Sequence, residues 1–136
     1  MLDAKLFAAL AGVAFVLSIL GRLRVLPRPN LWIHVANVSF GASYWQLFIA
    51  LVCAVFALAY FGIARLTQRP VNQTVGLGGF FLIAFASVVW LASSYLTISN
   101  SPPSSRLVIL LFLAIFSFIL GVTLSAANVA WVLLRK

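Results

Sequence analysis

Residues 107–134 have the sequence LVILLFLAIFSFILGVTLSAANVAWVLL, which contains no charged side chain. A helix of about 20 apolar residues is long enough to cross the hydrocarbon core of a bilayer. In lipid, every backbone hydrogen bond must be satisfied within the protein, and at this segment length a helix does so. We therefore predict a membrane-spanning helix over this stretch.

Three further apolar stretches precede it along the chain, at residues 4–21, 40–64 and 77–96. The segments between the four stretches hold all five prolines, as expected where helices must end. The sequence therefore predicts an all-α fold, an integral membrane four-helix bundle, with residues 1–136 forming a single transmembrane domain.

The first stretch has an alternative interpretation as a signal peptide, with residues 1–5 as its n-region and residues 6–20 as its apolar core. Small residues at the spacing of a cleavage site are missing, and Arg22 and Arg24 follow at once. We therefore expect this stretch to be a helix of the bundle.

The composition is far from that of a soluble domain. Hydrophobic residues make up 65% of the chain and charged residues only 7%, and the mean hydropathy is +1.19. The formal net charge is +8, but the basic residues lie singly or in pairs between apolar runs. Such residues anchor helix ends and meet anionic lipid headgroups. We therefore expect membrane lipids as partners, and no nucleic acid.

The basic residues also bear on orientation. With the N-terminus inside, five of them are cytoplasmic, namely Lys5, Arg65, Arg69, Arg135 and Lys136. The other four are then outside, so the positive-inside bias is small. We predict cytoplasmic N- and C-termini, in a bacterial inner (plasma) membrane.

Small and weakly polar residues recur at spacings of three and four in the second and fourth stretches, which places them on one face of each helix. Small residues let membrane helices approach closely, and Ser, Asn or Gln can hydrogen-bond between them. We predict a helix-packing seam formed by Ser43, Gln46, Ala50, Cys53, Ala57, Ala114, Ser117, Gly121, Ser125 and Asn128. Similar but weaker patterns in the first and third stretches are also compatible with chance enrichment of alanine.

The side chains that most catalysis requires are scarce. Asp3 is the only acidic residue, so the chain has no carboxylate pair for acid–base catalysis. His34 is the only histidine, and we interpret it as an interfacial residue, with a partner-facing or metal-ligating role as the alternative. We predict no enzyme activity, no metal site and no intrinsic cofactor. A membrane enzyme that relies on His34 is the least favoured alternative.

Two segments carry a family resemblance. Residues 65–76 have the sequence RLTQRPVNQTVG, and residues 121–128 have the sequence GVTLSAAN. They resemble an interhelical loop and the last helix in the C-terminal part of the haem–copper (cytochrome c) oxidase subunit I. The resemblance covers the last three predicted helices and implies a shared helix scaffold. It also implies that the N-terminus is inside, because that loop is cytoplasmic in the family.

The resemblance breaks at the metal ligands of the family. Aligned on the loop, the two haem-ligating histidines fall on Tyr44 and Gln46. A family His-Asp pair beside the non-redox metal falls on Ala36 and Asn37. Glutamine is no ordinary haem ligand, although tyrosine ligates haem in catalase. The resemblance therefore implies a degenerate relative without oxidase activity, in which Tyr44, Gln46 and His34 are weak candidates for cofactor binding.

Two functions follow as hypotheses. The first is a non-catalytic accessory or scaffold subunit of a membrane electron-transfer complex, with other membrane subunits as partners and with lipid or pigment bound at the interfaces. The second is a small homo-oligomeric transporter or channel for a neutral solute, in which Gln46 and Asn128 line a path. A coupled cation transporter is disfavoured, because none of the four stretches has an acid deep in the membrane.

Overall fold

The computed structural model of the chain describes residues 2–23, 32–35, 38–66, 71–96 and 105–135. Four of its helices are long and apolar enough to cross a membrane, which confirms the predicted helical class. The elements in chain order are α1 (Leu2–Arg22), β1 (Trp32–Val35), β2 (Val38–Gly41), α2 (Ala42–Leu66), α3 (Gln73–Leu96) and α4 (Ser105–Leu134).

The helix α3 begins earlier than hydropathy predicts, because a polar cap precedes its apolar run. The Asn72 side-chain oxygen Oδ1 accepts hydrogen bonds from the backbone N–H groups of Thr74 and Val75, at 3.1 and 3.3 Å. This is the geometry of an N-cap, which satisfies backbone donors that have no partner inside the helix. The helix therefore begins at Gln73, whereas the apolar stretch begins at Leu77.

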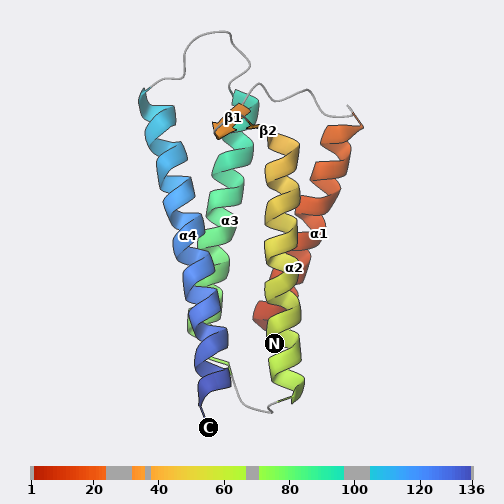
Figure 1. Cartoon of the computed structure of the whole chain (residues 1–136), viewed down its shortest axis with the longest axis vertical. Helices are drawn as coiled ribbons and strands as arrows, with labels where there is room; N and C mark the ends of the chain where they lie inside the picture. Colours follow the sequence, from red (N-terminus) through yellow and green to blue (C-terminus); the bar gives the residue numbers. More distant parts are fainter. Residues whose placement is uncertain (1, 24–31, 36–37, 67–70, 97–104, 136) are drawn as a thin grey trace.

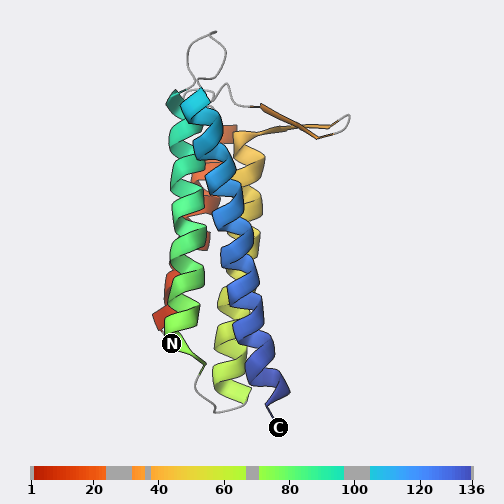
Figure 2. The same ribbon diagram turned by 90° about the vertical axis from the view of Figure 1, so that its left-hand side faces the viewer.

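A short antiparallel hairpin stands where the sequence predicts only a connector. Strands β1 and β2 pair from Trp32 with Gly41 to Val35 with Val38. Their β-branched and aromatic residues favour strands, a local preference that a search for apolar spans overlooks. Figure 2 shows the hairpin projecting away from the helices beside the beginning of α2. Because Phe40 belongs to β2, α2 begins at Ala42, two residues after the predicted start.

The four helices run side by side along the long axis of the molecule (Figure 1). Helix α1 packs chiefly against α2, and α3 chiefly against α4, while the contacts between these two pairs are fewer. We call the end where α1 and α3 begin and α2 and α4 finish the terminus end. The opposite end, beside β1 and β2, is the hairpin end.

An aromatic cluster joins the two helix pairs in the half of the bundle nearer the terminus end. The Phe7 side chain is fully buried, and its ring lies 5.6 Å from Phe56, 5.7 Å from Tyr60 and 5.4 Å from Phe80, between centroids. One residue of α1 thus contacts both α2 and α3. In the weak small-residue pattern of the first stretch, Ala4 and Ser18 are buried, Ala11 and Gly21 are half-buried, and Ala8 is exposed.

Candidate functional site

Polar side chains from different helices meet near the terminus end. The Asn128 side-chain nitrogen Nδ2, on α4, donates hydrogen bonds to the Tyr60 hydroxyl of α2 at 3.2 Å and to the Asn72 backbone carbonyl at 2.9 Å. Asn128 is buried, and a buried amide without such partners destabilises the fold. One side chain therefore links α2, α4 and the residue that caps α3.

The acidic residue Asp3 lies in the same region. Its side chain is buried, and its Oδ1 atom accepts a hydrogen bond from the Ala4 backbone N–H at 3.1 Å. Its Oδ2 atom approaches Gly76 so closely that a Cβ atom there would lie 2.8 Å away. The carboxylate thus lies beside the first turn of α3, the positive end of that helix dipole. We call Asp3, Tyr60, Asn72, Gly76 and Asn128 the polar cluster.

Helices α3 and α4 make backbone contact just beyond the polar cluster. A Cβ atom on Gly121 would lie 2.8 Å from the Gly79 carbonyl oxygen and 2.8 Å from the Ile83 Cγ1 atom. A Cβ atom on Gly79 would in turn collide with the Ser125 hydroxyl. Glycine at both positions is therefore what permits this distance between the helices.

The predicted seam residues can now be located. On α2 the side chains of Gln46, Ala50 and Cys53 are buried and Ala57 is half-buried. On α4 the buried members are Ala114, Gly121, Ser125 and Asn128, and Ser117 is half-buried. The Ser43 side chain lies outside the part of the chain that the structure describes.

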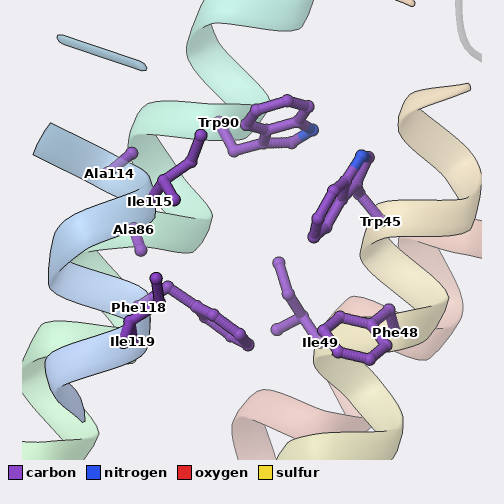
Figure 3. Close-up of a pocket in the computed structure, with 9 residues that line it drawn as sticks. All are labelled: Trp45, Phe48, Ile49, Ala86, Trp90, Ala114, Ile115, Phe118 and Ile119. Carbon is purple, nitrogen blue, oxygen red and sulfur yellow. The ribbon is translucent and has the colours of Figure 1, made fainter. Parts of the chain in front are cut away.

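A cavity of about 250 Å³ lies between α2 and the pair α3–α4, nearer the hairpin end. Its lining is formed by Trp45, Phe48, Ile49, Ala86, Trp90, Ala114, Ile115, Phe118 and Ile119 (Figure 3). Phe48, Ile115 and Ile119 are also exposed, so the cavity opens to the outer face of the bundle. We call it the aromatic groove, and no pattern in the sequence predicts it.

Four rings shape the aromatic groove. The Trp45 ring centroid lies 5.2 Å from that of Trp90 and 5.7 Å from that of Phe48, and the Phe48 and Phe118 centroids are 5.9 Å apart. The Trp45 Nε1 atom is buried, with no hydrogen-bond acceptor among the described residues. Figure 3 shows this nitrogen at the upper edge of the ring, toward the beginning of α2. The surface that the groove offers is therefore almost wholly apolar.

A second, smaller cavity of about 120 Å³ lies between α1, α2 and α3. Ile49 and Trp90 line both cavities and so form the wall between them. Gln46 and Ser87 are polar residues in the lining of this smaller space, and the Ser87 hydroxyl donates a hydrogen bond to the Ile83 carbonyl at 2.7 Å.

The three weak cofactor candidates do not converge. Tyr44 is 54% exposed, and the Arg22 guanidinium lies 5.1 Å from its ring centroid, whereas Gln46 is buried. The backbone of His34 lies in β1, and its side chain is outside the described part of the chain. Within the described residues, no three His, Cys, Asp or Glu side chains gather in a group that could hold a metal ion.

Comparison of the chain with protein families, with curated proteins and with solved structures yields no match. The function must therefore be inferred from the residues of this chain and from the geometry of its helix bundle.

Proposed function

We propose that this chain inserts into the bacterial inner membrane with both termini in the cytoplasm, and serves as a non-catalytic accessory or scaffold subunit of a membrane electron-transfer complex. The observation that carries the proposal is the outward face of α4. Only 11% of its most apolar segment is buried, against 22% to 33% in the other three helices. A helix so little covered by its own chain is the natural surface for a partner helix.

Aromatic residues mark this face. Phe112 and Phe116 lie four positions apart on α4, so they are neighbours on one side of the helix, and they are 69% and 66% exposed. Large aromatic rings offer much contact area at a small cost in side-chain entropy. The polar side chain of Asn128 is by contrast engaged inside the bundle. The outer surface therefore favours a function that depends on packing.

The electron-transfer assignment has a separate basis, the resemblance of residues 65–76 to a loop of oxidase subunit I. In that alignment the haem-ligand positions are Tyr44 and Gln46, and these point to different surroundings, one exposed and one buried. This favours a supporting role over catalysis. Lipid or pigment would fill the interfaces with the partner subunits.

Native mass spectrometry of the complex, extracted from its own membrane in mild detergent, tests the proposal. We expect the chain to be recovered with larger subunits that carry haem or pigment. The double variant Phe112→Ala/Phe116→Ala should reduce that recovery about tenfold, since an interface anchor commonly contributes 1 to 2 kcal/mol. The matched control is Phe81→Ala/Phe85→Ala on α3, where both rings are also exposed. Recovery of the chain alone, or equal loss in both variants, would refute the proposal.

A second candidate function is a homo-oligomeric pathway for a neutral solute, and the observation that favours it is the pair Gln46 and Ser87 in the smaller cavity. Solute flux into liposomes that disappears with Gln46→Leu would support this pathway. A homo-oligomer that shows no flux for a broad panel of neutral solutes would exclude it.

A further inference from the structure

The two faces of the β1–β2 hairpin differ in chemistry, and the proposed function gives neither a role. Successive residues of a strand alternate between the faces, and residues paired across the strands share one. One face carries four large apolar residues, in the pairs Ile33–Phe40 and Val35–Val38. The other face is mixed and includes the polar residues of the hairpin, in the pairs Trp32–Gly41 and His34–Ser39. We call them the apolar hairpin face and the polar hairpin face.

The hairpin is little covered by the helix bundle. Its strands contact chiefly each other and the beginning of α2. Figure 2 shows the hairpin at about a right angle to the helices and reaching away from them. A two-stranded hairpin by itself is at best marginally stable in water. Something other than the described helices must therefore cover the apolar hairpin face.

Two side chains mark the depth of the hairpin in a membrane. Arg22 is in the last turn of α1, and its guanidinium lies 5.1 Å from the centroid of the Tyr44 ring in the first turn of α2. A charged side chain is costly in hydrocarbon, and Arg and Tyr near the ends of spans lie at the level of the headgroups. Strand β2 ends at Gly41, before Tyr44 and thus farther from the bilayer centre. The hairpin therefore begins at headgroup level, and its direction in Figure 2 keeps it there.

The backbone of the hairpin excludes a deeper position. The sheet has two strands among the described residues, so each strand leaves one edge of N–H and C=O groups without a strand neighbour. Open edges of this kind do not occur in the hydrocarbon core, whereas headgroups and water can bond to them at the interface. An apolar face together with open edges favours the boundary between headgroups and acyl chains, where amphipathic helices also lie.

We propose that the β1–β2 hairpin is an interfacial anchor that lies flat on the lipid of the leaflet at the hairpin end. The apolar hairpin face meets the acyl chains, and the polar hairpin face meets headgroups and water. Each strand of four residues covers about 13 Å of lipid surface beside the bundle. The anchor holds the beginning of α2 at a fixed depth. The inference rests on the membrane insertion in the proposed function, but it requires no partner subunit.

Spin labels on neighbouring residues test the proposal, because adjacent positions of a strand are on opposite faces. Val38→Cys and Ser39→Cys are made separately in the full chain with Cys53→Ala, labelled with a nitroxide and reconstituted in phospholipid vesicles. Electron paramagnetic resonance measures collisions of the label with oxygen, which concentrates in lipid, and with a water-soluble nickel chelate. We expect the ratio of oxygen to chelate accessibility to be severalfold higher at Val38→Cys than at Ser39→Cys.

A second pair of labels and two references make the result specific. Ile33→Cys and His34→Cys repeat the comparison on β1, where the register requires the higher ratio at Ile33→Cys. Val13→Cys is the lipid reference, since Val13 is 57% exposed in the middle of α1, and Thr74→Cys in the first turn of α3 is the water reference. Chelate access at Val13→Cys would overturn the membrane insertion and the anchor together. A lipid value at Val13→Cys without alternation in the hairpin would overturn the anchor alone.

The same labels identify a different cover. A label at Val38→Cys that neither oxygen nor chelate reaches would show protein over the apolar hairpin face, such as a strand of a partner or of a second copy, and would overturn lipid as the occupant. A pair of charged variants gives an independent result. Val38→Lys should lift the hairpin from the lipid and lower the ratio at Ile33→Cys severalfold, whereas the matched Ser39→Lys should leave it unchanged. Equal responses to the two lysines would contradict the assignment of the faces.

Discussion

The two ends of the bundle use similar residues but pack them differently. At the terminus end, Gly79 and Gly121 let the backbones of α3 and α4 touch, and the ring of Phe7 fills the space between the helix pairs. At the hairpin end, the Trp45 and Trp90 rings meet at an angle of 47°, and a space of about 250 Å³ remains beside them. Large rings at a helix crossing keep the helices apart, whereas glycine permits contact, so the same fold is dense at one end and open at the other.

The buried polar atoms of the two ends differ in their hydrogen-bond partners. At the terminus end the Asn128 amide has acceptors on two other segments. At the hairpin end the Trp45 Nε1 atom has none among the described residues. The buried Ser125 hydroxyl, which lies against Gly79 in the dense part of the bundle, also has no partner among the described residues, so unsatisfied polar atoms occur in both parts.

The largest expected effect is that of Phe7→Ala, which removes the buried ring that joins the helix pairs. We expect a loss of about 3–5 kcal/mol in the free energy of unfolding, measured by denaturant titration in mild detergent. Phe118→Ala is the matched test at the hairpin end, where the ring is only partly buried beside an existing cavity. Its cost should be clearly smaller, and equal costs would contradict the difference between the ends.

A smaller effect is expected for Gly121→Ala, whose added methyl group would meet the Gly79 carbonyl and Ile83 at 2.8 Å. Overpacking of this kind costs about 1–3 kcal/mol, and thermal unfolding in detergent measures it. Gly78→Ala is the control, because a Cβ atom there has nothing within 4 Å. A control variant as unstable as Gly121→Ala would show that helix contact is not the cause.

Loss of the Asn128 hydrogen bonds comes next. Asn128→Leu should destabilise the bundle by about 1–2 kcal/mol, given two interhelical bonds of the strength usual in membrane proteins. Tyr60→Phe removes only one of these bonds and keeps the stacking of its ring on Phe7, so it should cost about 0.6 kcal/mol. If the losses of Asn128→Leu and Tyr60→Phe were additive in the double variant, the two side chains would not share a hydrogen bond.

The smallest effect is expected for Trp45→Phe in lipid-free detergent. The variant removes a buried donor without an acceptor among the described residues, so the unfolding free energy should change by no more than about 0.5 kcal/mol. Melting curves of the delipidated protein measure this. A large loss would show that the indole N–H is bonded within the protein.

Much of the helical architecture could be predicted from the sequence, because apolar length alone identifies a helix that can span a bilayer. The stretch at residues 107–134 lies within α4, and the stretch at 77–96 lies within α3. The actual start of α3 was missed, since it depends on the side chain of Asn72, which hydropathy does not consider. The β1–β2 hairpin was missed for the same reason, as strand preference is a local property of residues 32–41.

The candidate site was less predictable than the helices. Helical spacing placed Asn128 among the seam residues, and it is buried, but its acceptors on Tyr60 and Asn72 are 68 and 56 residues away in the chain. Trp90 is buried as well. Nothing in the sequence paired it with Trp45, because that contact depends on which helices are neighbours.

Hydropathy and helical periodicity are properties of single segments, so the sequence established four long apolar helices and the inward face of α4. They contain no information on how one helix is placed against another. The pairing of α1 with α2 and of α3 with α4, the meeting of Phe7 with Phe80 and the aromatic groove all arise from that placement. Only the tertiary structure decided them, because side chains from different helices must fill the space between those helices together. Residues distant in the chain therefore determine which parts of the bundle are closely packed and which part contains a cavity.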